Sequence, residues 1–400
     1  MNLQNTAHPS LGGRSGDMGS NQSDLRDRNE RLVLTILRRS GPLPKAELAR
    51  RTGLSAQTVS VIIRDLETRG LLEKGKKLRG KVGQPSVPME LSRTGAFFLG
   101  LKVGRRSAEL ILVNFVGEEL GHVSRSYNYP TPPRTLEFVK EAVEELRATL
   151  SEAERARIAG LGVATPYFLW EWASVIGVPP EDMAAWKGFD LQNEIAEMFD
   201  FPVYLGNDAT SACGAELTFG TAEIPSDFLY IYIGYFVGGG IVLNGRLYSG
   251  RLGNAGAIGT FPLQGDNSTV TQLVDTASLI GLERRLARSQ GNPTLALDPN
   301  VEFHLTEPTA VAQWLNEVAP TLALLIVGAC SIIDFPTIVI DGNMPKTMCE
   351  RVAQRVSEEF QLLPNSGIIH PEIVTGSLGP RARTLGAASL ALSKNFMLES

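Results

Sequence analysis

The sequence predicts an α/β protein in which an N-terminal winged helix-turn-helix precedes two similarly organised α/β lobes. One observation behind this prediction is a pair of short amphipathic helices around a glycine in residues 45–69. Another is that strand patterns alternate with helix patterns twice over after about residue 94. A third is charge, because residues 24–84 hold 15 Lys and Arg against 7 Asp and Glu in a chain of net charge −5. A basic head on an acidic body is expected when one domain contacts phosphates.

The segment KAELARRTGLSAQTVSVIIRDLETR is predicted to form two short helices joined at Gly53. Its second helix carries four apolar residues at helical spacing, expected to face inward: Val59, Ile62, Ile63 and Leu66. Side chains on the opposite face suit base edges in the major groove, since Gln pairs with adenine, Arg with guanine, and Val can touch the thymine methyl group. The residues assigned to DNA on this face are Gln57, Thr58, Ser60, Val61 and Arg64.

The segments around this motif complete the plan of a winged helix. An upstream helix carries Leu32, Val33, Ile36 and Leu37 on one side, and a basic hairpin follows the second helix. Cations in such a hairpin can reach phosphates or a neighbouring minor groove. Those assigned here are Lys76, Lys77, Arg79 and Lys81. The alternative is a small helical core without a DNA-binding role.

Composition argues against export, membrane insertion and a metal site. The first 23 residues are rich in Gly, Ser and Asn and resemble a disordered tail more than a signal peptide. The longest apolar stretch, 322–333, is shorter than the roughly 20 residues of a membrane-spanning helix. The three cysteines lack CxxC spacing and the four histidines are scattered, so reduced thiols and no metal are expected. The expected location is cytoplasmic.

Five parts of the chain are predicted: a disordered tail (1–23), the winged helix-turn-helix (24–84), a linker (85–93), a first α/β lobe (94–205) and a second α/β lobe (206–400). The linker is inferred from Pro85 and Pro88, which favour a stiff extended backbone. Strands are predicted at 97–103, 108–115, 158–164, 203–205, 228–233, 239–243 and 337–340, with long helices at 133–150 and 310–333. A cleft between the lobes is the expected ligand site.

Five segments in this order resemble the ROK family (repressors, open reading frames and kinases). They are GLGVATP, LGNDATSACGAE, IYIGYFVGGGIVLNGRLYSGRLGNAGAIG, FPTIVIDGN and LGAASLAL. The resemblance spans about residues 26–396 and implies an actin-like, ribonuclease H-like fold of the ATPase and sugar-kinase type. The winged helix resembles the regulator branch of that family. In this fold the C-terminal helix of the second lobe can pack back against the first lobe.

Departures from the family pattern argue against phosphoryl transfer. Sugar kinases of this family open their first lobe with an acidic residue and a Gly-Gly-Thr turn, where this chain has Lys102-Val103-Gly104-Arg105-Arg106. Two arginines in place of flexible small residues should prevent the usual nucleotide pose. The second phosphate loop, usually Gly-Thr-Gly, reads Gly234-Tyr235-Phe236, and only Gly238–Gly240 persist, which are as often structural as phosphate-binding. No catalytic residue and no cofactor are therefore expected.

The same comparison gives the candidate ligand residues. The zinc-site histidine of the family corresponds to Thr260, and the sugar-binding glutamate to Ala257, so no metal and a weakened hexose pocket are expected. Asn207-Asp208 matches the family's Asn-Asp pair, whose aspartate is the general base in the kinases. Here Asp208 is expected to accept a hydrogen bond from a ligand, and the alternative is a helix N-cap. The assigned ligand set is Asn207, Asp208, Gly239 and Thr260.

The function predicted from these features is DNA-binding transcriptional regulation, with repression of carbohydrate-related genes. The expected partners are double-stranded operator DNA, a sugar or sugar derivative as effector, and a second copy of the chain in a homodimer or homotetramer. The main alternative is an ATP-dependent sugar kinase with an added DNA-binding head. A third hypothesis is a constitutive DNA-binding protein whose lobes serve only for dimerisation.

Overall fold

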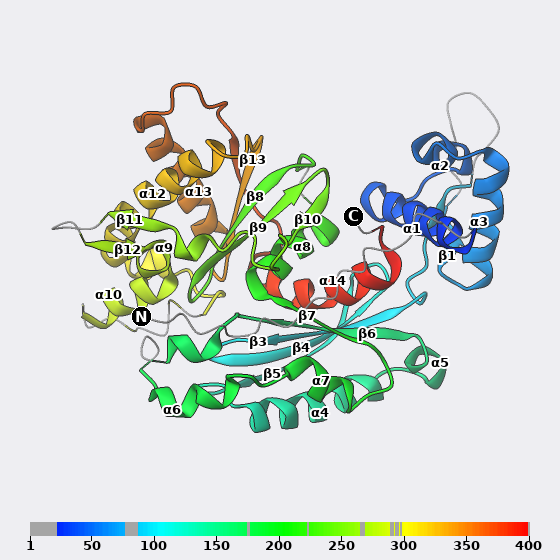
Figure 1. The fold of residues 1–400 in the computed structure, drawn as a ribbon, viewed down its shortest axis with the longest axis horizontal. Helices are drawn as coiled ribbons and strands as arrows, with labels where there is room; N and C mark the ends of the chain where they lie inside the picture. The colour runs from blue at the N-terminus through cyan, green and yellow to red at the C-terminus, as the bar shows by residue number, and fades with distance from the viewer. Residues whose placement is uncertain are drawn as a thin grey trace, which may run out of the picture.

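The computed structural model describes residues 22–76, 87–173, 177–221, 224–264, 269–288, 292, 296 and 298–398. Figure 1 shows a helical head beside two α/β lobes, with the last helix of the chain lying along the sheet of the first lobe. The observed architecture is therefore a winged helix-turn-helix followed by two lobes, as predicted.

The head consists of three helices closed by a short two-stranded sheet. Its elements are α1 (Gln22–Ser40), α2 (Lys45–Thr52), α3 (Ala56–Thr68), β1 (Leu72–Lys74) and β2 (Met89–Leu91). Helix α2 ends at Gly53, whose φ of 70° is left-handed and suits glycine. Helix α3 begins after Ser55, whose side chain accepts a hydrogen bond from the backbone N–H of Thr58. The four apolar residues predicted to face inward are buried, which confirms the helix-turn-helix.

The wing extends further along the chain than predicted. Strand β1 pairs antiparallel with β2, with Leu72 opposite Leu91 and Lys74 opposite Met89. The predicted linker at 85–93 is therefore wrong, because residues 89–91 form the second wing strand. Met89 and Leu91 are buried, and this short apolar alternation was obscured by Pro88. Three of the predicted wing cations, Lys77, Arg79 and Lys81, lie outside the described residues.

The first lobe is a five-stranded sheet in the order β5-β4-β3-β6-β7. Strands β3, β4 and β5 are antiparallel, whereas β6 and β7 run parallel to β3. Helices α4 and α7 cover one face of this sheet (Figure 1). The elements are β3 (Phe97–Val103), β4 (Ser107–Asn114), β5 (Glu119–Ser126), α4 (Pro132–Ala148), α5 (Glu152–Arg155), β6 (Ile158–Thr165), η1 (Leu169–Trp172), α6 (Pro180–Met183), η2 (Ala184–Trp186), α7 (Leu191–Ala196), β7 (Val203–Asn207) and α8 (Asp208–Phe219).

The second lobe repeats this topology with the order β10-β9-β8-β13-β14 and the same strand directions. The prediction of two similarly organised lobes is confirmed. The elements are β8 (Phe228–Ile233), β9 (Val237–Leu243), β10 (Arg246–Tyr248), η3 (Ile258–Thr260), β11 (Pro262–Gln264), β12 (Val270–Gln272), α9 (Leu273–Thr276), α10 (Leu279–Arg288), α11 (Phe303–Thr306), α12 (Pro308–Cys330), β13 (Thr337–Gly342), α13 (Lys346–Leu362), β14 (Glu372–Thr375), η6 (Gly379–Arg381) and α14 (Ala382–Phe396).

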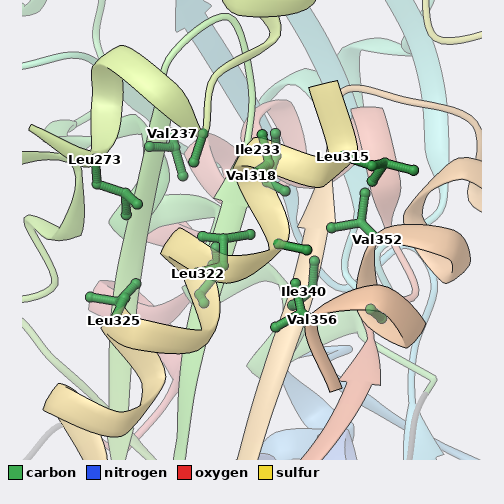
Figure 2. Close-up of a cluster of buried hydrophobic side chains, with 14 of the residues drawn as sticks. Ile233, Val237, Leu273, Leu315, Val318, Leu322, Leu325, Ile340, Val352 and Val356 are labelled. Carbon is green, nitrogen blue, oxygen red and sulfur yellow. The ribbon is translucent and has the colours of Figure 1, made fainter. Parts of the chain in front are cut away.

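Helices α12 and α13 close the outer face of the second sheet. Figure 2 shows Val318 and Leu322 of α12 beside Ile233 and Ile340 of the sheet, with Val356 of α13 nearby. By length and composition α12 could cross a membrane. Its fully buried positions belong to this core, and we interpret it as the core helix of the second lobe.

Helices α8 and α14 pack against each other between the two sheets, and α14 also lies on β3 and β6. The C-terminal helix therefore returns to the first lobe. The predicted boundary between 205 and 206 cuts through β7, which continues to Asn207. Two glycines allow α14 to approach the sheet: a Cβ at Gly100 would lie 2.5 Å from the Thr384 carbonyl oxygen, and one at Gly162 would lie 1.8 Å from the Ala387 carbonyl oxygen.

The head is docked on the lobes, and its core is continuous with the outer core of the first lobe and α14. Arg31 donates to the carbonyl oxygens of Lys394 (2.9 Å) and Met397 (3.3 Å) near the C-terminus. Arg38 donates to the carbonyl oxygen of Phe115 in the first lobe. Arg39 donates to the carbonyl oxygen of Gly245 in the β9–β10 turn of the second lobe. Helix α1 therefore contacts both lobes.

Candidate functional site

The outward face of α3 presents three of the five residues assigned to DNA. Gln57, Val61 and Arg64 are exposed, and 52% of Val61 is accessible. Thr58 and Ser60 are half-buried: the Thr58 hydroxyl bonds the Ser55 hydroxyl (2.8 Å), and the Ser60 hydroxyl donates to the Ala56 carbonyl oxygen (2.8 Å). The two hydroxyls have local partners, whereas Gln57, Val61 and Arg64 remain available to base edges.

A carboxylate network fixes α3 on α1 and so sets the direction of that face. The buried Glu30 of α1 accepts hydrogen bonds from Arg69 (2.6 Å) and Arg26 (3.1 Å), and Asp65 of α3 pairs with the same two arginines. Part of the basic charge counted in the head therefore holds the helices together. Lys76, which follows strand β1 at the base of the wing, is exposed and takes no part in this network.

A pocket of about 400 Å³ lies where the first lobe, the second lobe and the start of α14 meet. Its charged lining comprises five basic side chains and two carboxylates, together with a histidine: Lys102, Arg105, Arg106, Arg381, Arg383, Glu109, Glu119 and His122. The segment Lys102–Arg106, which was expected to prevent the usual nucleotide pose, is one wall of this pocket.

Lys102 is a buried cation on β3. Its ammonium group is 2.5 Å from the Glu109 carboxylate and 3.1 Å from the Ser107 hydroxyl. Burial, together with the nearby Arg383 guanidinium, lowers the pKa of Lys102 to about 8. His122 of β5 reaches the same carboxylate at 3.9 Å. The Glu109 carboxylate therefore lies close to Lys102, Ser107 and His122 at once.

Asp208 faces Arg383 of α14 at 3.6 Å, and Arg383 also lies over the Tyr232 ring at 5.1 Å. Although burial opposes it, Tyr232, Asp208 and Glu109 raise the pKa of Arg383. The N-cap of α8 is Asn207, whose side chain accepts from the backbone N–H groups of the next turn. Sequence reasoning did not single out Arg383, because a lone arginine at a helix start belongs to no motif.

The two degenerate phosphate loops are in contact. The Arg105 guanidinium lies 4.0 Å from the centre of the Phe236 ring, and that of Arg106 lies 5.9 Å from the Tyr235 ring. Burial lowers the pKa of Arg105 to about 10. Side chains of both segments therefore fill the space between them.

Of the four predicted ligand residues, only Asp208 contacts this charged cluster. Gly239 lies inside β9, where a Cβ would be 2.6 Å from the Tyr230 carbonyl oxygen, so its smallness is needed for packing. The exposed Thr260 donates its hydroxyl to the Ala257 carbonyl oxygen within its own turn (2.8 Å). Among the described residues, no group of three or more His, Cys, Asp or Glu could hold a metal ion.

Comparison with known families decides the class of the two lobes. Residues 98–394, most of the chain, match the ROK family. The chain belongs to the ROK family. Residues 24–77 match the MarR family, in agreement with the winged helix-turn-helix of the head. The predicted membership in the ROK family, with an N-terminal winged helix, is confirmed.

Relatives of this ROK protein align along most of its length. A xylose repressor of Bacillus subtilis (strain 168) is 22% identical over 393 residues, covering 93% of this chain and 97% of its own. The crystal structure of a ROK family transcriptional regulator, a homologue of the E. coli MLC protein, covers 94% of this chain and 98% of its own with 20% identity and a TM-score of 0.67.

A solved kinase of the family shares the lobes. The ROK family glucokinase from Streptomyces griseus, in complex with glucose and AMPPNP, is 20% identical with a TM-score of 0.59 and covers 74% of this chain and 100% of its own. At these identities the solved structures show the fold alone. They confirm the predicted two-lobed sugar-kinase fold.

Proposed function

We propose that this ROK protein is a transcriptional regulator that represses carbohydrate-related genes. Helix α3 and the wing bind double-stranded operator DNA, and the lobes sense a small molecule, a sugar or sugar derivative. The observation that carries the proposal is the exposed α3 face, with Gln57, Val61 and Arg64 held outward by the Glu30 network. The xylose repressor among its relatives supports the same class of function. Such a protein acts in the cytoplasm.

The head docks on the lobes in a way that supports ligand-dependent control. Helix α1 contacts the first lobe through Arg38 and the second lobe through Arg39, so a change in the angle between the lobes moves or strains α1. A ligand alters DNA affinity only by binding the two lobe arrangements unequally, and couplings of about 1–3 kcal/mol are usual.

A homodimer or homotetramer is the proposed functional unit. One helix-turn-helix seldom supplies enough affinity for an operator, whereas two heads related by a two-fold axis read half-sites about 34 Å apart. Sedimentation of the protein with and without operator DNA measures this assembly directly. A monomer on a single half-site would contradict it.

Phosphoryl transfer is not part of the proposed function. Lys102 stands at the position of the family's acidic residue, and Arg105 and Arg106 close against the second phosphate loop. A positive charge there opposes a metal-bound nucleotide, since phosphoryl transfer depends on positioning and on neutralising the phosphates. We expect no sugar-dependent ATP hydrolysis over a panel of sugars. Turnover above the rate without sugar would favour the kinase alternative.

Replacement of Arg64 by alanine tests the DNA-binding face. We expect a loss of about 1–3 kcal/mol in operator binding and relaxed preference at one base pair, because a bidentate contact to a base edge disappears. The measurement is fluorescence anisotropy at fixed salt with the intergenic DNA upstream of the gene and with a scrambled duplex. Arg134→Ala, which removes an exposed arginine from α4, is the matched control. Equal binding of both duplexes by the unmodified protein would overturn the proposal.

Replacement of Lys76 by alanine separates phosphate contacts from base contacts. We expect weaker binding to all sequences alike and a salt dependence reduced by about one unit, because one phosphate contact is lost. Anisotropy titrations at several salt concentrations measure this slope. A change in sequence preference instead would place Lys76 at a base edge.

A further inference from the structure

The pocket at the junction of the lobes has more positive charge than its carboxylates neutralise. Five basic side chains and two carboxylates line it. Of the carboxylates, Glu109 pairs with Lys102 at 2.5 Å, and Glu119 pairs with Arg381 at 3.3 Å. Even with Asp208 assigned to Arg383, cationic charge remains in excess.

Two of these cations, Lys102 and Arg383, lie where water screens their charge poorly. The side chain of Lys102 is 9% exposed and that of Arg383 is 12% exposed. Arg383 opposes protonation of both Lys102 and Arg105, so the cations repel one another. The Nε atoms of Arg106 and Arg383 are buried without a hydrogen-bond partner among the described residues. Buried cations with unused donors are costly unless an acceptor is supplied.

We propose that this pocket binds a small dianion, supplied by a phosphate group or by a pair of carboxylate groups of a metabolite, and that the effector is consequently an anion. This inference rests on the proposed regulatory function. Guanidinium groups bind carboxylates and phosphates through paired hydrogen bonds, and such bonds are strongest away from bulk water. A volume of about 400 Å³ accommodates a metabolite-sized molecule. Ile111 and Pro299 supply apolar contacts for its uncharged part.

The same residues disfavour a nucleotide with its metal ion as the occupant. Lys102 and Arg383 would repel a divalent cation, and the Arg105 guanidinium is stacked on Phe236. The pocket therefore suits an anion that arrives without a metal.

The pocket is placed to transmit its occupancy to the head. Lys102 and Arg106 come from the first lobe, Tyr235 and Asn343 from the second, and Arg383 from the first turn of α14. A bound dianion links these parts. The other end of α14 supplies the carbonyl oxygens that accept hydrogen bonds from Arg31 of α1. Helix α14 thus connects the pocket to the head.

Calorimetric titration of the full chain tests the inference, with four probes: sodium sulfate, inorganic phosphate, glucose 6-phosphate and glucose. We expect the dianions to bind, glucose to give no heat, and a difference between phosphate and glucose 6-phosphate to report the organic part. A succinate titration distinguishes a carboxylate ligand from a phosphate ligand. Binding of glucose with no binding of any dianion would overturn the inference.

A charge-removing variant locates the site. Arg106→Gln is expected to weaken sulfate and phosphate binding at least tenfold, and Arg106→Lys to restore part of it. The matched control is Arg125→Gln, because Arg125 belongs to the same lobe and also stacks on a ring, that of Phe138, outside the pocket. The melting temperature without ligand checks folding, and we expect no fall for Arg106→Gln. Equal sulfate affinity in all four proteins would overturn the assignment.

The same preparations are titrated with operator DNA, which separates the two proposals. Operator binding without dianion binding removes the inference and leaves the proposed function standing. Dianion binding without operator binding removes the proposed function and leaves an anion-binding pocket that has no role as an effector site. Dianion binding that changes operator affinity supports both.

The affinity for sulfate is expected to fall between pH 7 and pH 9. Sulfate keeps its two charges over this range, whereas Lys102, with a pKa of about 8, loses its proton. The charged groups that act on Lys102 are Arg383, Glu109 and Asp208, and binding of a dianion favours the protonated lysine. A Lys102→Met variant should bind sulfate more weakly and with a flat pH profile. An unchanged wild-type affinity across this range would contradict a role for Lys102.

Discussion

Replacement of Phe115 by alanine is expected to cost about 3–5 kcal/mol of folding free energy and to uncouple the head from the lobes. Phe115 is fully buried, and its ring lies 4.9 Å from Phe396 of α14 and 6.2 Å from Phe98 of β3. Arg38 of α1 lies over the same ring at 5.7 Å and donates to the backbone carbonyl oxygen of Phe115. Loss of the ring opens a cavity where the cores of the head and the first lobe join.

Calorimetry and hydrogen exchange measure this result. The wild-type head should protect the amides of α1 as strongly as the first lobe, because the two share one core. In Phe115→Ala we expect α1 to exchange earlier and a separate, lower-temperature transition for the head. The control is Phe201→Ala, which removes a buried ring stacked on Phe199 in the first lobe, away from the head. A similar loss of protection in α1 in both variants would contradict a specific role for the Phe115 contact.

Local patterns in the sequence were sufficient for most of the fold. The strands at 97–103 and 228–233 have the predicted bounds, because each is a mostly apolar run that ends before a glycine, Gly104 or Gly234. The exposed strand β5 (Glu119–Ser126) was not predicted, since an edge strand without a buried face carries no apolar alternation. The wing strand β2 was missed for a different reason, because its alternation covers only three residues and follows Pro88.

The candidate site was likewise predicted only in part. The resemblance indicated that Lys102–Arg106 departs from a phosphate turn, but only the folded chain shows Arg105 stacked on Phe236. Arg383 and Asp208 meet because α14 returns to the first lobe, a contact between segments far apart in the sequence. Contacts of the head with Lys394, 363 residues from Arg31, are equally non-local. Contacts of this kind produce no spacing pattern that could be recognised in the sequence.

Helix α14, which joins the pocket to the head, packs against the first sheet at two glycines, Gly100 and Gly162. Gly162 is the more sensitive of the two to substitution. A Cβ on Gly162 of β6 would lie 1.8 Å from the carbonyl oxygen and 2.7 Å from the carbonyl carbon of Ala387. Both atoms are backbone, so α14 as a whole must move. Gly162→Ala, the smallest possible change, is therefore expected to destabilise the fold by about 3 kcal/mol, at the upper end for an overpacked core.

Urea denaturation of Gly162→Ala measures this loss against Gly281→Ala, the same chemical change in α10. A Cβ at Gly281 meets its nearest atom at 3.5 Å, so the control should be neutral or slightly stabilising. A displaced α14 carries Arg383 at one end and the carbonyl oxygen of Lys394 at the other. Sulfate binding and protection of α1 should then weaken together in folded Gly162→Ala. Loss of one without the other would show that α14 does not join the pocket to the head.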